Sequence, residues 1–320
     1  MTQLRVGIIG LGAVGERLLN KFLEHNETTV AAICEPNADR AQVFKERLPD
    51  VHFYSDYQEI LEDENIDLVY IAVPPKFHHQ IALDVIAAGK HILCEKPLAN
   101  SYQEAAEMAE AAKKATVVHA MNFPTPYSAA YSVLKDKLQS KAVGNIKRVE
   151  LQMYFQEWPR FWQKNPWIAG REQGGFVREV SPHFVQLMID LLGDVTNIHS
   201  HIQYPEDPQA CENSIVAHAE LSDGTPILIN GLSGIGQKEH LAFKVYGDQG
   251  VLSLVNWGQL QEETAEGVSP INLESKDSLM GLIDEVVKAV NGQEAHLVTF
   301  DRGLEVQFVL EQLLGNPIIE

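Results

Sequence analysis

The stretch Gly10-Leu11-Gly12-Ala13-Val14-Gly15 decides the fold, because it joins an apolar strand to an amphipathic helix. In a dinucleotide-binding turn the first glycine permits the tight bend, the second lets the backbone approach a pyrophosphate, and the third packs the helix on the strand. The helix N-terminus then faces the anion. We therefore predict that Gly10, Gly12, Ala13, Val14 and Gly15 bind the phosphates of a nucleotide. A glycine turn without a nucleotide is the alternative.

Strand and helix patterns alternate around this stretch through the first 122 residues. After the strand at 4–9 and the helix at 13–24, the alternation predicts the following segments. The expected strands are 29–34, 68–73, 92–94 and 116–121, and the expected helices are 38–48, 77–88 and 102–114, with a short helix opened by a capping box at Ser55. Such alternation is typical of an α/β fold with a doubly wound parallel sheet, a Rossmann domain.

An acidic residue follows the second predicted strand. Glu35 lies about 20 residues beyond the glycine loop, where a carboxylate binds the ribose hydroxyls of NAD. Because a carboxylate repels a 2′-phosphate, Glu35 favours NAD as the cofactor over NADP. NADP stays open, since Arg40 is near enough to soften the preference. A solvated surface glutamate is the alternative interpretation of Glu35.

The pattern changes after residue 122. Alternating strands at 146–155, 214–221, 226–230, 241–246 and 251–255 are joined by turn sequences, which predicts antiparallel hairpins. Helices are expected at 127–138, 182–192, 279–290 and 304–314. We predict a Rossmann domain over residues 1–122 and, over 123–320, an α+β domain with a mostly antiparallel open sheet for substrate binding and oligomerisation.

Composition limits the class of protein. The 320-residue chain has a formal net charge of −19, so its field repels nucleic acid and anionic membranes. No apolar run approaches the ~20 residues of a membrane span. Cys34, Cys94 and Cys211 have no metal-ligand or redox spacing, and no metal is expected. These features indicate a cytoplasmic protein with buried, reduced thiols that acts on a small molecule.

A second chemical motif follows a buried strand. Residues 92–94 read as a strand that ends at Glu95-Lys96-Pro97, where proline cannot continue the ladder. Ligands bind at the carboxyl ends of strands in open α/β sheets. Lys96, beside a nucleotide site, is therefore placed to contact a substrate.

The glycine loop, Pro74-Pro75-Lys76-Phe77-His78 and Glu95-Lys96-Pro97 occur in this order, and together they resemble the glucose–fructose oxidoreductase/inositol dehydrogenase/MocA (Gfo/Idh/MocA) family. The resemblance extends over nearly the whole chain. It implies an NAD(P)-dependent oxidoreductase that acts on a carbinol or carbonyl of a sugar, inositol or related polyol. It also implies that Lys96 contacts substrate and nicotinamide. Pro74, His78, Glu95 and Asn122 are then expected at the cofactor cleft, although His78 can also be read as an ordinary helix-start residue.

The family's second motif places an aspartate four residues before a catalytic histidine. Here Glu179 and His183 have that spacing, with Glu for Asp and with Gln186 in place of a later acid. Histidine suits a base that takes the hydroxyl proton as hydride leaves carbon. We predict that His183 is the acid/base and that Glu179 orients it. The sequence Ser181-Pro182 predicts that the helix begins there, with His183 in its first turn. A helix-start histidine bonded to the backbone is the alternative.

A long aromatic loop, residues 158–175, lies between the Glu95-Lys96-Pro97 motif and the Glu179/His183 pair. Trp158, Trp162 and Trp167 are candidate substrate residues, because aromatic faces suit the C–H faces of a sugar ring. Tyr154, at the end of an alternating strand, is a fourth candidate. The rings could instead fill an interface. The half-polar strands predict a homodimer or homotetramer assembled through the C-terminal sheet, as the resemblance also implies.

Two other classes of protein fit the same residues. One is a non-catalytic NAD-sensing regulator on this scaffold. The other is a lyase or glycosidase that uses NAD transiently and releases no NADH. The presence of both Lys96 and His183 favours a reversible hydride-transfer enzyme over the regulator.

Overall fold

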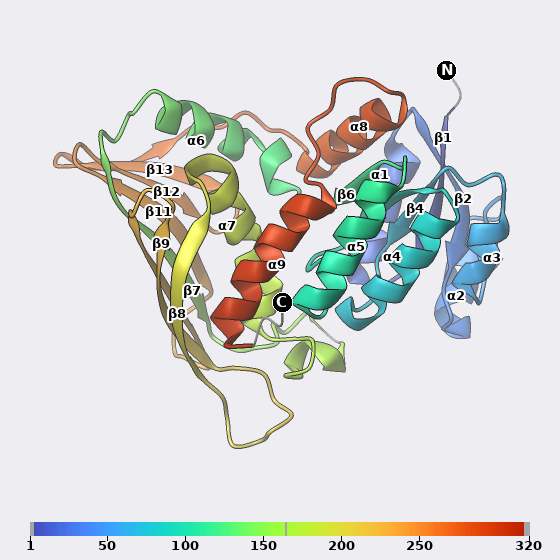
Figure 1. Cartoon of the computed structure of the whole chain (residues 1–320), viewed down its shortest axis with the longest axis horizontal. Coiled ribbons are helices and arrows are strands. Elements are labelled where there is room, and N and C mark those ends of the chain that lie inside the picture. Colours follow the sequence, from blue (N-terminus) through green and yellow to red (C-terminus); the bar gives the residue numbers. More distant parts are fainter. Residues whose placement is uncertain (1–2, 164, 317–320) are drawn as a thin grey trace. The chain divides into compact units, whose positions relative to one another are not determined.

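The computed structural model describes residues 3–163 and 165–316. The chain forms two compact units, coloured along the sequence in Figure 1. The first comprises Met1–Pro124 and Leu279–Leu304, and the second comprises Thr125–Ser278 and Glu305–Glu320. The α8 helix (Ser278–Val290) therefore belongs, from Leu279 onward, to the unit that holds the N-terminal sheet.

The first unit is built on a six-stranded sheet in the order β3-β2-β1-β4-β5-β6, and every pair is parallel. Its strands are β1 (Leu4–Ile9), β2 (Thr28–Cys34), β3 (His52–Tyr54), β4 (Leu68–Ile71), β5 (His91–Cys94) and β6 (His119–Met121). Its helices are α1 (Ala13–Glu24), α2 (Ala38–Arg47), α3 (Tyr57–Glu62), η1 (Pro75–Phe77), α4 (His78–Ala87), α5 (Tyr102–Lys114) and α8 (Ser278–Val290), while α9 (Phe300–Leu314) runs on into the second unit. This strand order is that of the Rossmann fold, so the predicted fold class is confirmed.

Local sequence explains these elements. The apolar side of α1 buries Leu18, Leu19 and Phe22 against the sheet. Ser101 caps α5 by accepting from the backbone N–H of Glu104 at 3.3 Å. The predicted cap of α3 was wrong by one residue: the Asp56 carboxylate, not Ser55, accepts from the next turn. Each cap satisfies a backbone donor that the helix itself cannot.

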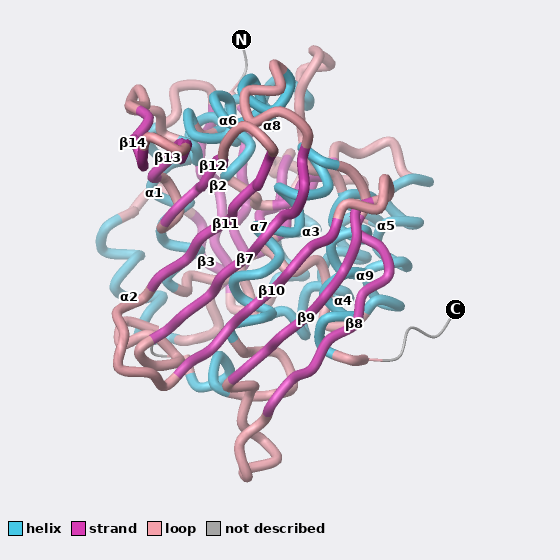
Figure 2. The backbone as a smooth tube through the Cα atoms, turned by 90° about the vertical axis from the view of Figure 1, so that its left-hand side faces the viewer, coloured by secondary structure: helices cyan, strands magenta, loops and turns pink. Residues whose placement is uncertain are grey.

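The second unit contains an eight-stranded sheet in the order β14-β13-β12-β11-β7-β10-β9-β8, which Figure 2 shows face on. Its strands are β7 (Ile146–Phe155), β8 (Val195–Gln203), β9 (Ser214–Leu221), β10 (Pro226–Ser233), β11 (His240–Gly247), β12 (Val251–Val255), β13 (Gln259–Thr264) and β14 (Gly267–Ile271). All pairs are antiparallel except β7 with β10, so the mostly antiparallel sheet is confirmed. Strands β8, β13 and β14 were not predicted, because their exposed, polar residues lack a clear apolar alternation.

Helices cover one face of this sheet. They are η2 (Thr125–Tyr127), α6 (Ala129–Gln139), η3 (Pro166–Ala169) and α7 (Phe176–Leu192). Phe176 of α7 packs on Phe155 of β7, with ring centroids 5.4 Å apart. On the opposite face, turned to the viewer in Figure 2, the described residues of this unit form no helix.

The predicted start of α7 at Ser181-Pro182 was wrong. The helix begins at Phe176, and Pro182 lies inside it. Gly175, with φ +99°, precedes the first turn, and the Ser181 hydroxyl donates to the carbonyl of Val177 at 2.6 Å instead of capping. His183 is thus the eighth residue of the helix, beyond the first turn where the helix dipole acts.

Among residues 3–163 and 165–316, no helix combines the length and the apolar character needed to cross a bilayer. Within the same ranges, no three side chains of the His, Cys, Asp and Glu types gather as metal ligands would.

Candidate functional site

The glycine loop joins the carboxyl end of β1 to α1. Gly10 has φ +96°, and a Cβ there would lie 2.6 Å from the carbonyl oxygen of Ala72. A Cβ on Gly15 would lie 2.2 Å from the carbonyl oxygen of Gly10, whereas a Cβ on Gly12 would meet none of the described atoms within 4 Å outside its chain neighbours and the helix backbone. The N-cap residue Gly12 has no side chain with which to cap α1. The loop thus offers uncapped backbone donors and room for a pyrophosphate, so these residues fit the phosphates of a dinucleotide.

Glu35 stands beside this loop at the end of β2. Its carboxylate is buried and accepts hydrogen bonds from the backbone N–H groups of Leu11 (3.0 Å) and Asn37 (2.9 Å). The Arg40 guanidinium lies 3.6 Å away. Glu35 therefore fixes the glycine loop through its bond to Leu11. The structure brings it together with the glycine loop, as predicted.

The ends of β4, β5 and β6 form a buried hydrogen-bond network around Glu95. The Tyr70 hydroxyl (2.6 Å) and the Asn122 amide (2.5 Å) both donate to one carboxylate oxygen. Burial raises the pKa of Glu95, and those two donors together with the Lys96 charge oppose that rise. Burial and the Glu95 charge hold the pKa of Tyr70 well above its usual value, so its hydroxyl stays a donor. Lys96 follows Glu95, half-buried, and its bond to Pro97 is cis.

His78 ties the loops after β4 and β5 together. Its ring is fully buried, and its two nitrogens lie 2.9 Å from the carbonyl oxygens of Val73 and Pro97. Burial lowers the pKa of the imidazole. Pro74 precedes η1 in the same loop and is half-buried. His78 thereby fixes the backbone of the loop that contains Lys96. Its effect on a bound cofactor would be indirect, through the positions of these two loops.

In the second unit, α7 carries the other predicted pair. Glu179 and His183 are four residues apart on one helix, so they lie on the same face one turn from each other. Both side chains are half-buried. The His183 ring stands perpendicular to the ring of Trp257, with centroids 5.3 Å apart. The charge of Arg178 acts on Glu212, a carboxylate at the start of the helix.

Glu212 caps α7 from the loop before β9. Its carboxylate accepts from the backbone N–H of Val177 at 2.7 Å, and it is 2% exposed. Gly175 has φ +99°, which favours glycine, and a Cβ there would also lie 2.2 Å from the same carboxylate and displace it. Burial raises the pKa of Glu212 to about 7, against opposing contributions from the Val177 hydrogen bond and Arg178. The helix that carries Glu179 and His183 is therefore held by a carboxyl group that titrates near neutral pH.

This burial predicts a pH-dependent stability. Because the folded state raises the pKa of Glu212 from its ordinary value of 4.5 to about 7, the folded state is favoured at low pH. The contribution is lost as the pH rises through 4.5 to 7, by about 3 kcal/mol in total. Glu212→Gln keeps an oxygen for Val177 and removes the titration. Chemical unfolding from pH 4.5 to 8 should show the variant gaining stability relative to the wild type as the pH rises.

Glu206→Gln is the matched control, since Glu206 is exposed in the same loop and its replacement should leave the pH dependence unchanged. A wild type and a Glu212→Gln variant whose unfolding free energies run parallel across this range would contradict the assignment.

Trp158 of the aromatic loop contacts the loop itself and the elements on either side of it. Trp158 donates its indole N–H to the carbonyl of Ile168 at 3.3 Å and packs against Phe155 and Phe176. Trp162 is 53% exposed, and Trp167 is half-buried in η3. Trp158 therefore supports the fold of the loop, while the ring of Trp162 is exposed, with the Arg160 guanidinium 5.8 Å from its centroid.

The structure does not bring Tyr154 to the His183 side. Tyr154 alternates with Met153 and Phe155, which face α7, so it lies on the opposite, open face of the sheet. There its hydroxyl accepts from the Asn230 amide at 2.9 Å, and its ring stacks on His240.

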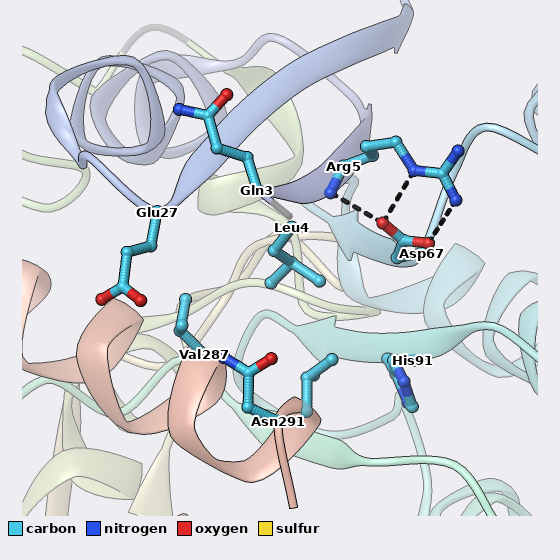
Figure 3. Close-up of a pocket in the computed structure, with 9 residues that line it drawn as sticks. Gln3, Leu4, Arg5, Glu27, Asp67, His91, Val287 and Asn291 are labelled. Atoms are coloured by element: carbon cyan, nitrogen blue, oxygen red, sulfur yellow. Dashed lines mark hydrogen bonds and ion pairs between the residues drawn. The ribbon is translucent and has the colours of Figure 1, made fainter. Parts of the chain in front are cut away.

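A separate hollow of about 670 Å³ opens at the amino edge of the first unit's sheet (Figure 3). In it the Arg5 guanidinium and backbone N–H bind the Asp67 carboxylate, and His91 and the end of α8 complete the wall. None of the predicted site residues lines it. This hollow lies at the strand ends opposite the glycine loop, so it is not the dinucleotide site.

The doubly wound sheet, the glycine loop and the buried acid at β2 define a dinucleotide-binding protein of the Rossmann class. Comparison with known families agrees along the chain: residues 4–123 match the model of the oxidoreductase family with an NAD-binding Rossmann fold, and residues 131–253 match the GFO/IDH/MocA C-terminal domain. The chain belongs to the GFO/IDH/MocA oxidoreductase family.

Individual relatives are distant. Oxidoreductase P35 of Formosa agariphila is 28% identical over 73% of this chain and 72% of its own. Levoglucosan dehydrogenase of Pseudarthrobacter phenanthrenivorans is 29% identical over 65% of this chain and 56% of its own. The solved structure of a levoglucosan dehydrogenase with NADH and L-sorbose superimposes with a TM-score of 0.84 at 20% identity, covering 98% of this chain and 96% of that one. At that identity the likeness shows the fold.

Three residues, one in the Glu95 network and two beside α7, were not predicted from the sequence. Tyr70 is a polar residue in an otherwise apolar strand, which was a usable signal for a buried hydroxyl. Glu212 carries no local signal, because its partner is a helix 35 residues away. Trp257 stands just before Gly258 in a hairpin, where a turn residue would be expected.

Proposed function

We propose that this protein transfers hydride between NAD and a carbinol or carbonyl of a sugar, an inositol or a related polyol. The observation that carries the proposal is the position of Lys96: it follows β5 at the same sheet edge as the glycine loop, anchored by the buried Glu95 network. Relatives named as levoglucosan and myo-inositol dehydrogenases support the substrate class.

The proposed roles follow from the chemistry of each group. Lys96 hydrogen-bonds the reacting oxygen and stabilises its charge. His183 takes the hydroxyl proton during oxidation and returns it during reduction, with Glu179 orienting the imidazole. Bound NAD supplies the hydride acceptor, held by Gly10, Gly12, Ala13, Val14 and Gly15 at the phosphates, by Glu35 at the ribose and by the Pro74, His78, Glu95 and Asn122 edge. Residues 1–122 would bind the cofactor, and residues 123–320 the substrate.

We propose NAD as the preferred cofactor over NADP. The buried Glu35 carboxylate would repel a 2′-phosphate, although Arg40 is 3.6 Å away and one relative is named as an NADP(+) enzyme. Calorimetric titration with NADH and NADPH tests the preference, and tighter binding of NADPH would contradict it.

We also propose a homodimer or homotetramer in the cytoplasm. The helix-free face of the eight-stranded sheet carries exposed apolar residues, including Val216 and Leu232, 50% and 37% exposed. Such a face is suited to cover by a second copy. Light scattering of the full chain tests the assembly, and a monomer at micromolar concentration would contradict it.

The function itself is tested by NADH formation. Wild-type protein is incubated with NAD and a panel of inositols, pyranosides and anhydrosugars, and absorbance at the NADH band is followed. Turnover with at least one cyclic polyol is expected. NAD binding without turnover on any member would favour the regulator.

A further inference from the structure

Trp257 has a backbone conformation that is unusual for its size. It lies in the tight turn between β12 and β13, and its φ is +72°, while Asn256 before it has φ +44°. Glycine and asparagine adopt this left-handed region readily, whereas a bulky side chain is a genuine outlier there. The adjacent residue is Gly258, so the turn places tryptophan where the smaller residue would be less strained. Outliers of this kind cluster at ligand-binding sites.

The indole packs against two consecutive residues of α7. Its ring stacks on Phe184, with centroids 5.4 Å apart and planes 27° from parallel. It stands perpendicular to the ring of His183 at 5.3 Å. Phe184 is buried, yet Trp257 keeps 41% of its surface exposed. The turn thus brings a large, partly open aromatic surface to the side chain assigned as acid/base.

We propose that Trp257 determines specificity by stacking on the C–H face of a cyclic polyol whose reacting hydroxyl is bound at His183. The inference rests on the proposed role of His183. A hydroxyl within hydrogen-bond reach of that imidazole, about 2.6–3.2 Å, leaves the remaining ring atoms of a small substrate within contact distance of the indole. A pyranose or cyclitol presents a continuous apolar face to an aromatic ring, and an open-chain alditol does not.

The contact between Trp257 and His183 gives a reason for the strained backbone at Trp257. A turn chosen only to cover Phe184 could use any apolar residue, and a glycine or asparagine turn would join the strands with less strain. In the observed left-handed conformation, the turn holds the Trp257 ring against His183 with the two ring planes perpendicular. Trp257 is therefore a specificity-determining residue, with no part in proton transfer.

The test compares binding of cyclic and open-chain polyols to the full chain loaded with NADH, by calorimetry. Trp257→Leu removes the aromatic face and keeps an apolar cover on Phe184. Trp257→Asn suits the left-handed backbone and serves if the leucine variant folds poorly. Trp257→Phe retains a smaller face. We expect about tenfold weaker binding of myo-inositol and methyl glucopyranosides to the leucine and asparagine variants, a smaller loss for phenylalanine, and unchanged binding of sorbitol.

Equal affinities of wild type and Trp257→Leu for cyclic polyols would overturn the inference. An equal loss for sorbitol would overturn it too, as would a wild type that binds no cyclic polyol. A different outcome separates the two proposals. If cyclic polyols bind the wild type about tenfold more tightly than the variants, but incubation with NAD and the same polyols yields no NADH, then Trp257 keeps its role in binding and the proposed hydride transfer fails.

Discussion

Lys96→Ala is expected to lower kcat for NADH formation by about three orders of magnitude, with NADH affinity changed far less. The lysine is assigned to the reacting oxygen, and removal of such a positioned group typically costs 10²–10⁴-fold. The anchor of the loop should survive, because Tyr70 and Asn122 hold Glu95, not Lys96, by hydrogen bonds. The measurement is steady-state kinetics on the best cyclic polyol, with NADH binding followed by calorimetry.

Lys113→Ala is the matched control, since it removes the same charge from the exposed surface of α5 and should leave kcat unchanged. If Lys96→Ala retained more than a tenth of the wild-type kcat, its assignment to the reacting oxygen would be wrong. A fall in NADH affinity with kcat unchanged would assign Lys96 to cofactor binding alone.

Gly15→Ala is expected both to destabilise the fold and to abolish tight NADH binding. Its Cβ would lie 2.2 Å from the carbonyl oxygen of Gly10, a backbone atom that cannot move aside without reshaping the loop. Overpacking of this kind costs about 1–3 kcal/mol. Thermal unfolding measures the stability, and calorimetry with NADH measures the affinity.

Gly12→Ala separates the two effects. Gly12 has an ordinary φ of −63°, and a Cβ there meets no atom within 4 Å, so the melting temperature should not change. The added methyl would instead occupy the approach to the pyrophosphate, and NADH affinity should fall at least tenfold. A Gly12→Ala protein that binds NADH as tightly as the wild type would refute the placement of the phosphates.

The first unit was largely predictable from sequence because its signals are local. The glycine loop, the capping at Ser101 and the end of β5 at Glu95 each depend on neighbours within a few residues. The network around Glu95 was not predictable in detail. Its donors come from β4 and β6, and a linear pattern does not report which side chains meet across a parallel sheet.

The second unit was harder to predict from sequence, because its key contacts join residues that are distant along the chain. Ser181-Pro182 is a good local signal for a helix start, but Glu212, from a distant loop, caps a helix that begins earlier at Phe176. A tertiary contact thus overrode local propensity. Trp257 could not be placed beside His183 from sequence, because a hairpin turn and a helix meet there.

Isotope transfer tests the central claim most directly. A cyclic polyol that the wild type oxidises is prepared with deuterium at its ring carbons and incubated with NAD, and the NADH formed is analysed by mass spectrometry. Direct hydride transfer predicts one deuterium in each NADH, formed at rates that collapse in Lys96→Ala and His183→Ala. Conversion of the polyol with no NADH released, as a lyase or glycosidase using NAD transiently would show, or NADH without deuterium, would contradict the account.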